Sequence, residues 1–573
     1  MKNKYISISN FKLPKKNEIL LTFKAFSKKE WAIFGSLVFV FILSTLIVLH
    51  YVNQSFMIKV PMKGGNITEG IIGTPRFVNP LLAFSDVDKD LVNLIYSGLM
   101  RKDKDGNLIL DLAESYEVAP NHLSYTFTLK DKIYFQDGEP VTIDDIIFTI
   151  QEAKNPVLRV SNAGNWERVS VEKIDEKTVR FNLRTQDAGF LENTTLGIMP
   201  AHLWKGFPME LNDRNTSPVG SGPFMIKNST KEAQGIVKSY GLVPFKKFTL
   251  GKPYVKSINL KFYNNESDLI SALEKGEVDQ ISQISPENAE KLKEKGYKIE
   301  SYVLPRIFGM FFNHNENQLF IDKSIVSAIN TYLDKKRILE EVLYGYGQII
   351  DSPMPNKNAQ EDEKLLTREE KKDLAENILT KAGWKKNEDG FFAKKEAILS
   401  FSISTSNSED LKKTAELIQK NLMEIGMKVE VKTFELGDLN QSVIKPRKYD
   451  ALLFGEIINR QSDLFAFWHS SQRKEPGLNV AMYTNVKVDK ILEEALSIHD
   501  KEKREAKYLE FENEIKKENP AVFIYSPEFI YVVKDKLEGI SNMDIPSSKD
   551  RFNEVYNWYT ETDSVWKIFT PNN

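Results

Sequence analysis

The residue types that carry most enzyme chemistry are absent or scattered in this chain. It contains no cysteine, which excludes disulfides, thiolate zinc sites, a cysteine nucleophile and a cysteine that carries a lipid. Six histidines occur, but no two stand at i, i+4 spacing and no HExxH motif is present, so we expect no histidine-built metal site. The six are His50, His122, His202, His314, His469 and His499.

Motifs for nucleophiles and nucleotides do not indicate an enzyme either. Residues 170–173 and 442–445 both fit the Ser-x-x-Lys pattern of penicillin-interactive enzymes, but no Lys-Thr-Gly follows, so we interpret both as chance matches. GxSxG, Walker and GxGxxG motifs are absent, and Gly220-Ser-Gly222 precedes Pro223, which favours a turn. Carboxylate pairs cannot be placed across a site from sequence alone. We expect no catalytic residues, cofactor or metal.

An apolar stretch at residues 31–52, with no Asp, Glu, Lys or Arg, divides the chain. A helix from Trp31 to Leu49 would be about 28 Å long, close to the thickness of a bilayer's hydrocarbon core. We therefore expect residues 31–52 to be a transmembrane anchor, between a lysine-rich stub at 1–30 and a large polar body.

The charge of the stub predicts the orientation. Residues 1–30 carry eight lysines against Glu18 and Glu30, a net of +6 (8 − 2). Positive flanks stay cytoplasmic, so we expect a single-pass cell-membrane protein with its body on the extracytoplasmic side. The rest of the chain then carries −8 (−2 − 6), which gives no basic surplus for nucleic acid. The alternative is a cleaved signal, whose apolar region is usually 7–15 residues long and ends at small residues.

Helical and strand patterns are mixed along the body, without repeats or low-complexity runs. This mixture predicts an α/β or α+β fold with more than one lobe, held together by its core because disulfides are excluded. We expect strands at 67–72, 123–130, 178–183, 257–263, 399–405, 427–433, 449–455 and 521–533. We expect helices at 86–100, from Thr142 onward, and at 324–343, 364–382, 408–425 and 486–518.

A series of short motifs runs through residues 64–560. They are Asn79-Pro80, Leu94-Ile-Tyr-Ser-Gly-Leu99, Asp105-Gly106, Asp111-Leu-Ala-Glu-Ser-Tyr-Glu117, Tyr125-Thr-Phe-Thr-Leu-Lys130, Phe135-Gln-Asp-Gly138, Thr142-Ile-Asp-Asp145, Gly220-Ser-Gly-Pro-Phe224, Gly251-Lys-Pro253, Gly276-Glu-Val-Asp279, Phe312-Asn313, Ala382-Gly-Trp384, Ile425-Gly426, Phe467-Trp-His-Ser-Ser471, Asn479 and Tyr483. In this order and spacing they resemble the family 5 extracellular solute-binding proteins, the peptide- and nickel-binding receptors of ABC importers.

The resemblance implies a two-lobed clamp of the type II periplasmic-binding-protein kind, with an additional inserted domain. Carried onto this chain, domain I combines 62–99, 210–304 and 530–573, domain II is the insertion 100–209, and domain III spans 305–529. Hinge closure would engulf the ligand, with no bond made or broken. The implied partners of this monomer are a peptide ligand, the permease and ATPase subunits of an ABC transporter, and the membrane.

The resemblance also implies contact residues. In peptide-binding members, an extended ligand pairs its backbone with a strand of the second lobe. That strand resembles Tyr449-Asp-Ala-Leu-Leu-Phe-Gly-Glu456, so we expect contacts from Phe454, Gly455 and Glu456. The facing loop of the first lobe would supply Phe84, Ser85 and Asp86. Trp468, with Phe467, would either line the site or pack beneath the strand.

One position departs from the family pattern. Peptide binders place an acidic residue shortly after this strand, where it pairs with the free amino group of the ligand. The corresponding residue is Asn459, and Glu456 or Asp463 would substitute for the missing acid. Two alternatives to peptide import therefore remain: a peptide sensor or chaperone-like binder on the same scaffold, and a binder of a chelated metal such as nickel.

Overall fold

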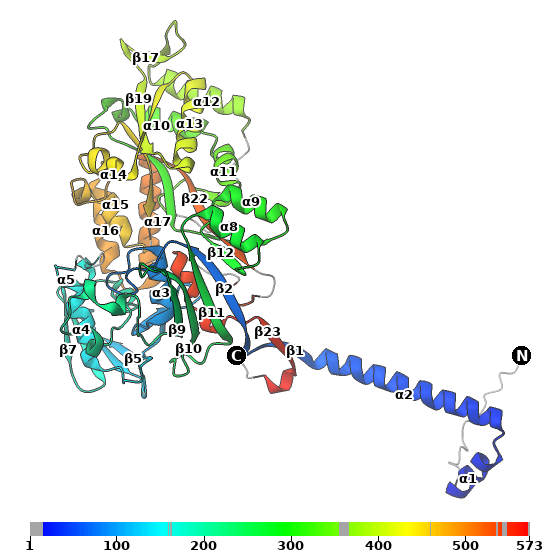
Figure 1. Ribbon diagram of the computed structural model, residues 1–573. Helices are drawn as coiled ribbons and strands as arrows, with labels where there is room; N and C mark the ends of the chain where they lie inside the picture. Colours follow the sequence, from blue (N-terminus) through cyan, green and yellow to red (C-terminus); the bar gives the residue numbers. More distant parts are fainter. Residues whose placement is uncertain are drawn as a thin grey trace, which may run out of the picture. The chain divides into compact units, whose positions relative to one another are not determined.

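The computed structural model describes residues 15–158, 160, 163–354, 366–458, 460–533, 537–540 and 547–570 (Figure 1). Contacts divide the chain into two compact units. One is made of the described parts of 1–62 and 562–573, and the other is residues 63–561. We call the first the anchor unit and the second the body.

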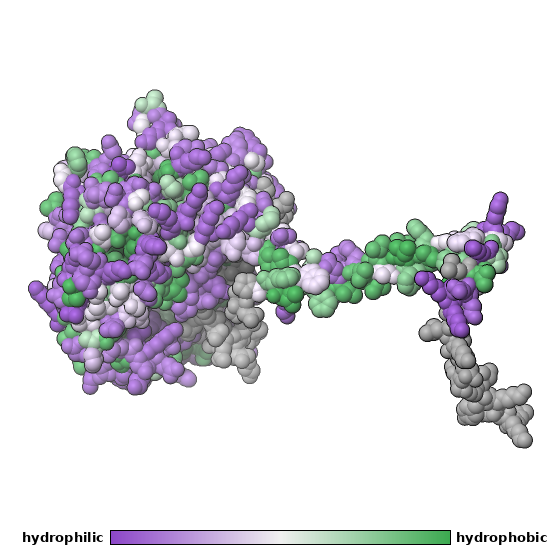
Figure 2. Space-filling view, turned by 90° about the horizontal axis from the view of Figure 1, so that it is seen from below, coloured by the Kyte–Doolittle hydropathy of each residue, from purple (hydrophilic) through white to green (hydrophobic). Residues whose placement is uncertain are grey.

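The anchor unit contains α1 (Lys16–Ala25), α2 (Lys28–Phe56), the paired strands β1 (Met57–Met62) and β23 (Glu561–Trp566), and η8 (Lys567–Phe569). α2 begins where Ser27 accepts a hydrogen bond from the Glu30 N–H and the Glu30 carboxylate accepts one from the Ser27 N–H. It contains the whole of 31–52, and Figure 2 shows hydrophobic residues along much of it. Among the described residues it is the one helix long and apolar enough to cross a membrane.

A mixed twelve-stranded sheet runs through the body. Its main path is β20 (Lys428–Phe434), β19 (Ser400–Ser406), β21 (Ala451–Ile457), β14 (Arg306–Phe312), β22 (Ala521–Val533), β12 (Gln280–Ser282), β2 (Gly64–Ile72), β11 (Val255–Tyr263), β10 (Val237–Pro244) and β9 (Phe224–Lys231). Two more strands, β13 (Lys298–Val303) and β15 (Gly347–Ile349), pair with β22.

β22 contributes side chains to hydrophobic cores in two parts of the body. Its first half pairs with β14 and packs Phe523 and Tyr525 into the cores around β14 and β21. Its second half pairs with β12 and β13 and packs Tyr531 into the core around β2 and β11. We call these two parts the second and the first lobe. β22 and the segment between β13 and β14 run from one lobe to the other.

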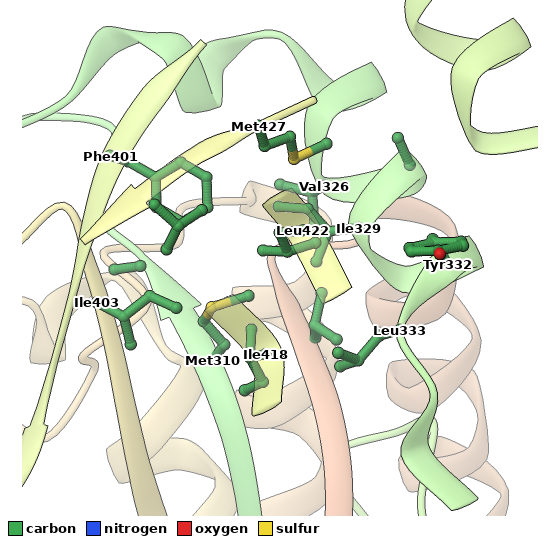
Figure 3. Close-up of a cluster of buried hydrophobic side chains, with 14 of the residues drawn as sticks. Met310, Val326, Ile329, Tyr332, Leu333, Phe401, Ile403, Ile418, Leu422 and Met427 are labelled. Atoms are coloured by element: carbon green, nitrogen blue, oxygen red, sulfur yellow. The ribbon is translucent and has the colours of Figure 1, made fainter. Parts of the chain in front are cut away.

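The second lobe has helices on both sides of its strands. α10 (Lys323–Tyr332), α11 (Lys335–Leu343), α12 (Arg368–Lys381) and α13 (Glu409–Glu424) surround the core that Figure 3 shows, which includes Ile329, Leu422 and Ile403. α15 (Asp463–Trp468), α16 (Val486–Ser497) and α17 (Lys501–Glu518) enclose a second core around Trp468. The minor elements are β16 (Lys385–Lys386), β17 (Phe392–Lys394), β18 (Ala397–Ile398), α14 (Leu436–Asp438) and η4 (Leu439–Ile444).

The first lobe carries a separate four-stranded antiparallel sheet, ordered β5 (Ala113–Val118), β6 (Ser124–Leu129), β8 (Thr178–Leu183), β7 (Val169–Lys173). The alternation predicted around 123–130 is confirmed, because Tyr125, Phe127 and Leu129 are buried and the residues between them are half-buried. These side chains form a core with α4 (Ile143–Ala153) that is separate from the core under β2. Short elements nearby are β3 (Met100–Lys102), β4 (Leu108–Leu110), α5 (Gly164–Glu167), α6 (Phe190–Asn193) and α7 (Ala201–Trp204).

Around β2 the first lobe contains α3 (Asp86–Ile95), α8 (Glu266–Glu274) and α9 (Pro286–Glu294). A buried charge cluster ties the late segment η6 (Ser548–Phe552) to this part of the chain. Arg551 Nη2 donates to Glu69 Oε1 at 2.8 Å and to Asp90 Oδ2 at 2.7 Å, and all three side chains are fully buried. Burial raises the pKa of Asp90 to about 6, against the opposing effect of Arg551.

Three of the expected helices differ from the observed ones. The helix expected over 324–343 is two helices, because Asp334 caps α11 by accepting from the Arg337 N–H. The helix expected over 486–518 is likewise divided, with Asp500 capping α17. The helix expected over 86–100 ends at Ile95, whose carbonyl accepts from the Gly222 N–H. α12 begins at Arg368, and residues 364–365 of that expected helix lie outside the described residues.

Candidate functional site

The last residues of β21 have an unpaired backbone edge. On one side β21 pairs with β14 along its whole length, from Ala451 with Phe312 to Ile457 with Arg306. On the other side it pairs with β19 only through Ala451 and Leu452, and the Leu453 carbonyl accepts from the Thr405 hydroxyl. No described strand pairs with residues 454–457 on that side. Their N–H and C=O groups on this edge are therefore free to pair with an added extended chain.

The close approach of Phe308, on β14, favours glycine at position 455. A Cβ atom on Gly455 would be 2.8 Å from the Phe308 ring, closer than side chains tolerate. Phe308 is itself held by stacking on Tyr525 of β22, with ring centroids 5.2 Å apart. Phe454 is half-buried against the core around Trp468, whereas the Ile457 side chain is 47% exposed.

Glu456 is a buried acid without a partner. Its side chain is 2% exposed, and neither carboxylate oxygen has a hydrogen-bond donor in the structure. Burial raises the pKa of Glu456 well above its ordinary value of 4.5, and the Trp468 indole opposes this shift. Trp468 Nε1 also lacks hydrogen-bond geometry to any acceptor, although it is fully buried. Two complementary polar groups thus lie unsatisfied beneath the open edge, which is unusual for a folded protein.

Trp468 packs in the core of the second lobe. Its ring centroid is 5.9 Å from that of Phe523, 6.1 Å from Tyr483 and 6.3 Å from Phe311. Of the two placements that the sequence left open, the structure shows packing beneath the strand. Trp468 therefore affects the open edge only indirectly, through its position beside Glu456.

The residues expected from the first lobe lie at the start of α3. Ser85 caps this helix by accepting from the Asp88 N–H, and its hydroxyl donates to Asp88 Oδ2 at 2.7 Å. Asp86 Oδ2 accepts from Gln283 Nε2 at 3.2 Å, and Phe84 is 81% exposed. Among the described residues, no hydrogen bond, ion pair or ring contact joins this group to residues 454–456 or 468. Asn459 lies outside the described residues.

The two lobes touch next to the open edge. Arg460 Nη1 donates to Asn193 Oδ1 at 2.9 Å, and the Ala188 N–H donates to the Leu496 carbonyl at 3.2 Å. Asp463, expected as a substitute acid, accepts from the Arg460 N–H at 3.0 Å at the start of α15. The segment that follows β21 thereby binds the inserted sheet domain of the first lobe.

A histidine pair makes a second contact between the lobes. The rings of His122 and His499 stack with centroids 3.7 Å apart, and the Tyr125 hydroxyl lies 3.4 Å from His499 Nε2. Burial, then the nearby His122, lowers the pKa of His499, while Asp187 opposes and Arg504 reinforces this effect. Sequence reasoning missed this pair and the Arg460–Asn193 bond, because each joins residues hundreds of positions apart without a shared motif.

A surface pocket of about 410 Å³ lies elsewhere, among β9, β10, β11 and the start of α8. Its lining includes Lys238, Lys261 and Asp268 and none of the expected contact residues. The described residues contain no group of three His, Cys, Asp or Glu side chains that could hold a metal ion. The candidate site is therefore the open edge of β21 with Glu456 beneath it.

Comparisons with known proteins connect this geometry to a family. The model of the bacterial extracellular solute-binding proteins, family 5, matches residues 107–476. The chain is 29% identical over 493 residues to the oligopeptide-binding protein AppA of Bacillus subtilis, covering 84% of this chain and 89% of that protein.

Solved structures give the same result for the fold. The structure of Bacillus subtilis AppA in complex with a nonapeptide aligns with a TM-score of 0.65 at 28% identity, covering 88% of this chain and 100% of that one. NikZ of Campylobacter jejuni, in complex with Ni(L-His), aligns with a TM-score of 0.68 at 25% identity, covering 86% and 99%. The two-lobed α/β fold and the family resemblance expected from the sequence are thus confirmed.

Proposed function

The chain belongs to the family 5 bacterial extracellular solute-binding proteins, and on this premise we propose that it is a membrane-anchored receptor that captures peptides and delivers them to an ABC permease. It would act by binding alone, without catalysis. The family match supports a solute-binding role outside the cytoplasm. The likeness to a relative whose structure holds a nonapeptide supports a peptide as the solute.

The observation that carries peptide binding is the free edge of β21. A strand edge recognises the repeating N–H and C=O groups of an extended ligand and is indifferent to its side chains. Residues 454–457 offer such an edge beside the place where the lobes touch. A peptide bound there would lie between the lobes and be covered when they close.

We assign the contact residues as follows. Phe454 and Gly455 present the backbone edge. Glu456 binds the amino group of the ligand, in place of the acidic residue that peptide binders have where this chain has Asn459. In contact with an ammonium group, the ionised Glu456 carboxylate would gain a charged hydrogen-bond donor for its two buried oxygens. Trp468 supports Glu456 from below. Phe84, Ser85 and Asp86 would face the ligand from the first lobe.

The hydrophobic cores support the proposed division into domains. Domain II, residues 100–209, has a core of its own, distinct from the core of domain I around β2 and from those of domain III around β14 and β21. Domain I would comprise 62–99, 210–304 and 530–573, of which the described residues 562–570 group with α2. Domain III would comprise 305–529.

α2 supports the proposed anchor. Its apolar part, residues 31–52, is long enough to span a bilayer, and the basic stub before it favours a cytoplasmic N-terminus. The body would then work as a tethered monomer on the extracytoplasmic side. The ABC permease and ATPase subunits are its proposed partners.

Mass spectrometry of small molecules that co-purify with the full chain tests this function. We expect a mixture of short peptides, released on denaturation and absent from a parallel preparation of the apo protein. Titration calorimetry of the apo protein with synthetic peptides should then give saturable binding that an N-acetylated peptide weakens. Recovery of a nickel chelate without peptides, or binding of Ni–histidine but no peptide, would refute the proposal in favour of the metal alternative.

A further inference from the structure

The C-terminal segment of the chain returns to the outer end of α2. β23 pairs with β1, and β1 follows α2 without an intervening residue (Figure 1). Trp566 Nε1 donates to Asn53 Oδ1 at 2.7 Å, across 513 positions of sequence, and the Trp566 ring lies 6.3 Å from that of Phe56. Trp566 is thereby fixed beside the last turn of α2.

Three apolar side chains of the C-terminal segment are exposed at this place. Trp566, Ile568 and Phe569 are 43%, 75% and 76% exposed, and we call them the C-terminal apolar patch. Ile568 and Phe569 lie on η8, a single 3₁₀ turn that contributes to none of the hydrophobic cores of the body. Burying such large apolar side chains in an apolar environment is favourable.

The position of the patch along α2 sets its depth in a membrane. Residues 31–52 form about 33 Å of helix (22 × 1.5 Å), which matches the hydrocarbon core of a bilayer. Asn53, the partner of Trp566, is the first residue beyond this stretch and would lie among the headgroups. Tryptophan is enriched at that depth because its ring is apolar and its N–H is polar.

The other end of the apolar stretch has a comparable aromatic cluster. The Trp31 ring lies 5.8 Å from Phe23 and 5.9 Å from Phe34. The two tryptophans thus lie about one hydrocarbon thickness apart along α2, one supplied by the helix itself and the other by the distant end of the chain. This is the arrangement of the aromatic belts at the two faces of a membrane.

We propose that residues 561–570 form a second membrane contact, in which the C-terminal apolar patch inserts into the headgroup region of the bilayer that α2 spans. The proposal rests on the proposed anchor. A lipid surface is the occupant because the patch is hydrogen-bonded to the last turn of the spanning helix and shares its depth. The body, which begins at residue 63 and ends at residue 561, would then be tied to the membrane at both of its ends.

The absence of native cysteine allows a direct test by single-site labelling of the full chain. Ile568→Cys and Phe569→Cys would each carry a polarity-sensitive fluorophore, in nanodiscs of phosphatidylethanolamine and phosphatidylglycerol with and without lipids that bear a quencher near the headgroup. Val486→Cys, an 85% exposed apolar position of the body, is the matched control. Leu43→Cys, in the middle of α2, reports on the anchor with a quencher deep in the acyl chains.

We expect labels at 568 and 569 to show blue-shifted emission and to lose intensity with quencher-bearing lipid, while the label at 486 does neither. If they respond like the label at 486 while the label at 43 is quenched, the second contact is refuted and the anchor stands. If the label at 43 also escapes quenching, the anchor itself fails and the contact with it. Labels at 568 and 569 that are shielded from aqueous iodide but not quenched by lipid would mean that another protein covers the patch, which also overturns the proposal.

Discussion

Glu456 should lower the free energy of unfolding of the ligand-free protein as the pH rises, and Glu456→Gln should remove this pH dependence. Both Glu456 oxygens are buried without a donor, and burial raises its pKa well above 4.5. The folded protein therefore binds a proton that the unfolded chain has released. The stability from this group is full below the unfolded pKa and declines as the pH rises toward the folded pKa.

The size of the effect follows from proton linkage. One extra proton in the folded state changes the free energy of unfolding by about 1.4 kcal/mol per pH unit, and no more, between the two pKa values. Above pH 5, the curve of the native protein should fall relative to that of Glu456→Gln with a slope approaching this limit. The slope should vanish once the carboxyl is ionised in both states.

Urea unfolding of the ligand-free chain, followed by tryptophan fluorescence at pH 5 to 8, measures these curves. Glu388→Gln, at an exposed position in the turn between β16 and β17, is the matched control and should run parallel to the native protein. Parallel curves for Glu456→Gln as well would show that the carboxyl is already ionised in the folded state. The reasoning about its burial would then be wrong.

The same residue makes a prediction for binding. A ligand ammonium group should ionise the Glu456 carboxyl, so peptide binding below the raised pKa of this carboxyl should release a proton, measurable by calorimetry in buffers of different ionisation enthalpy. Because a hydrogen bond to a charged group is worth about 1.5–3 kcal/mol, Glu456→Gln should weaken binding on the order of tenfold or more. Unchanged affinity without proton release would remove Glu456 from the site.

Three further predictions concern the edge, the lobe contact and the first lobe. Gly455→Ala places a methyl group against Phe308, so it should weaken peptide binding by calorimetry and lower stability by about 1–3 kcal/mol. Acidification should open the lobes, because burial and the stacked His122 both disfavour the protonated form of His499. X-ray scattering at pH 8 and pH 5.5 should show a larger radius of gyration at low pH, and His499→Gln should reduce the difference. Arg551→Met leaves two buried carboxylates without a counter-ion and should lower the urea midpoint by the equivalent of about 3–5 kcal/mol.

Control variants separate these effects from general damage. Gly437→Ala adds a methyl group with nothing within 4 Å and should change neither binding nor stability. Lys412→Met removes an exposed cation and should leave the urea midpoint unchanged. A Gly455→Ala protein with native affinity, a scattering profile independent of pH, or an Arg551→Met protein of native stability would each contradict its prediction.

Local patterns predicted most of the elements, and the errors have local causes. The alternation around Phe127 and the apolar run of β22 were sufficient, because burial on one face gives alternation and burial on both faces gives a continuous apolar run. The patterns at 324–343 and 486–518 each predicted one helix where the structure has two, because Asp334 and Asp500 begin new helices as N-caps. Both were visible in the sequence, as aspartates before charged helical turns.

The site was less predictable because it depends on pairing between distant strands. The resemblance placed Phe454, Gly455 and Glu456 on one strand, but the free edge arises only because β19 pairs with β21 at two positions. The burial of Glu456 depends on which face of β21 turns toward Trp468. Its pKa shift therefore required the three-dimensional structure.

The two connections between the lobes are also joined to each other. The Ser526 hydroxyl donates to the Leu304 carbonyl at 2.6 Å, and the Leu304 N–H donates to the Pro527 carbonyl at 3.0 Å. β15 pairs with β22 at the same place, Gln348 with Ser526 and Gly347 with Pro527. Because the two connections are hydrogen-bonded to each other, they do not bend independently but can twist together. Cargo of different lengths should therefore change how far the lobes rotate, while the axis of rotation stays the same.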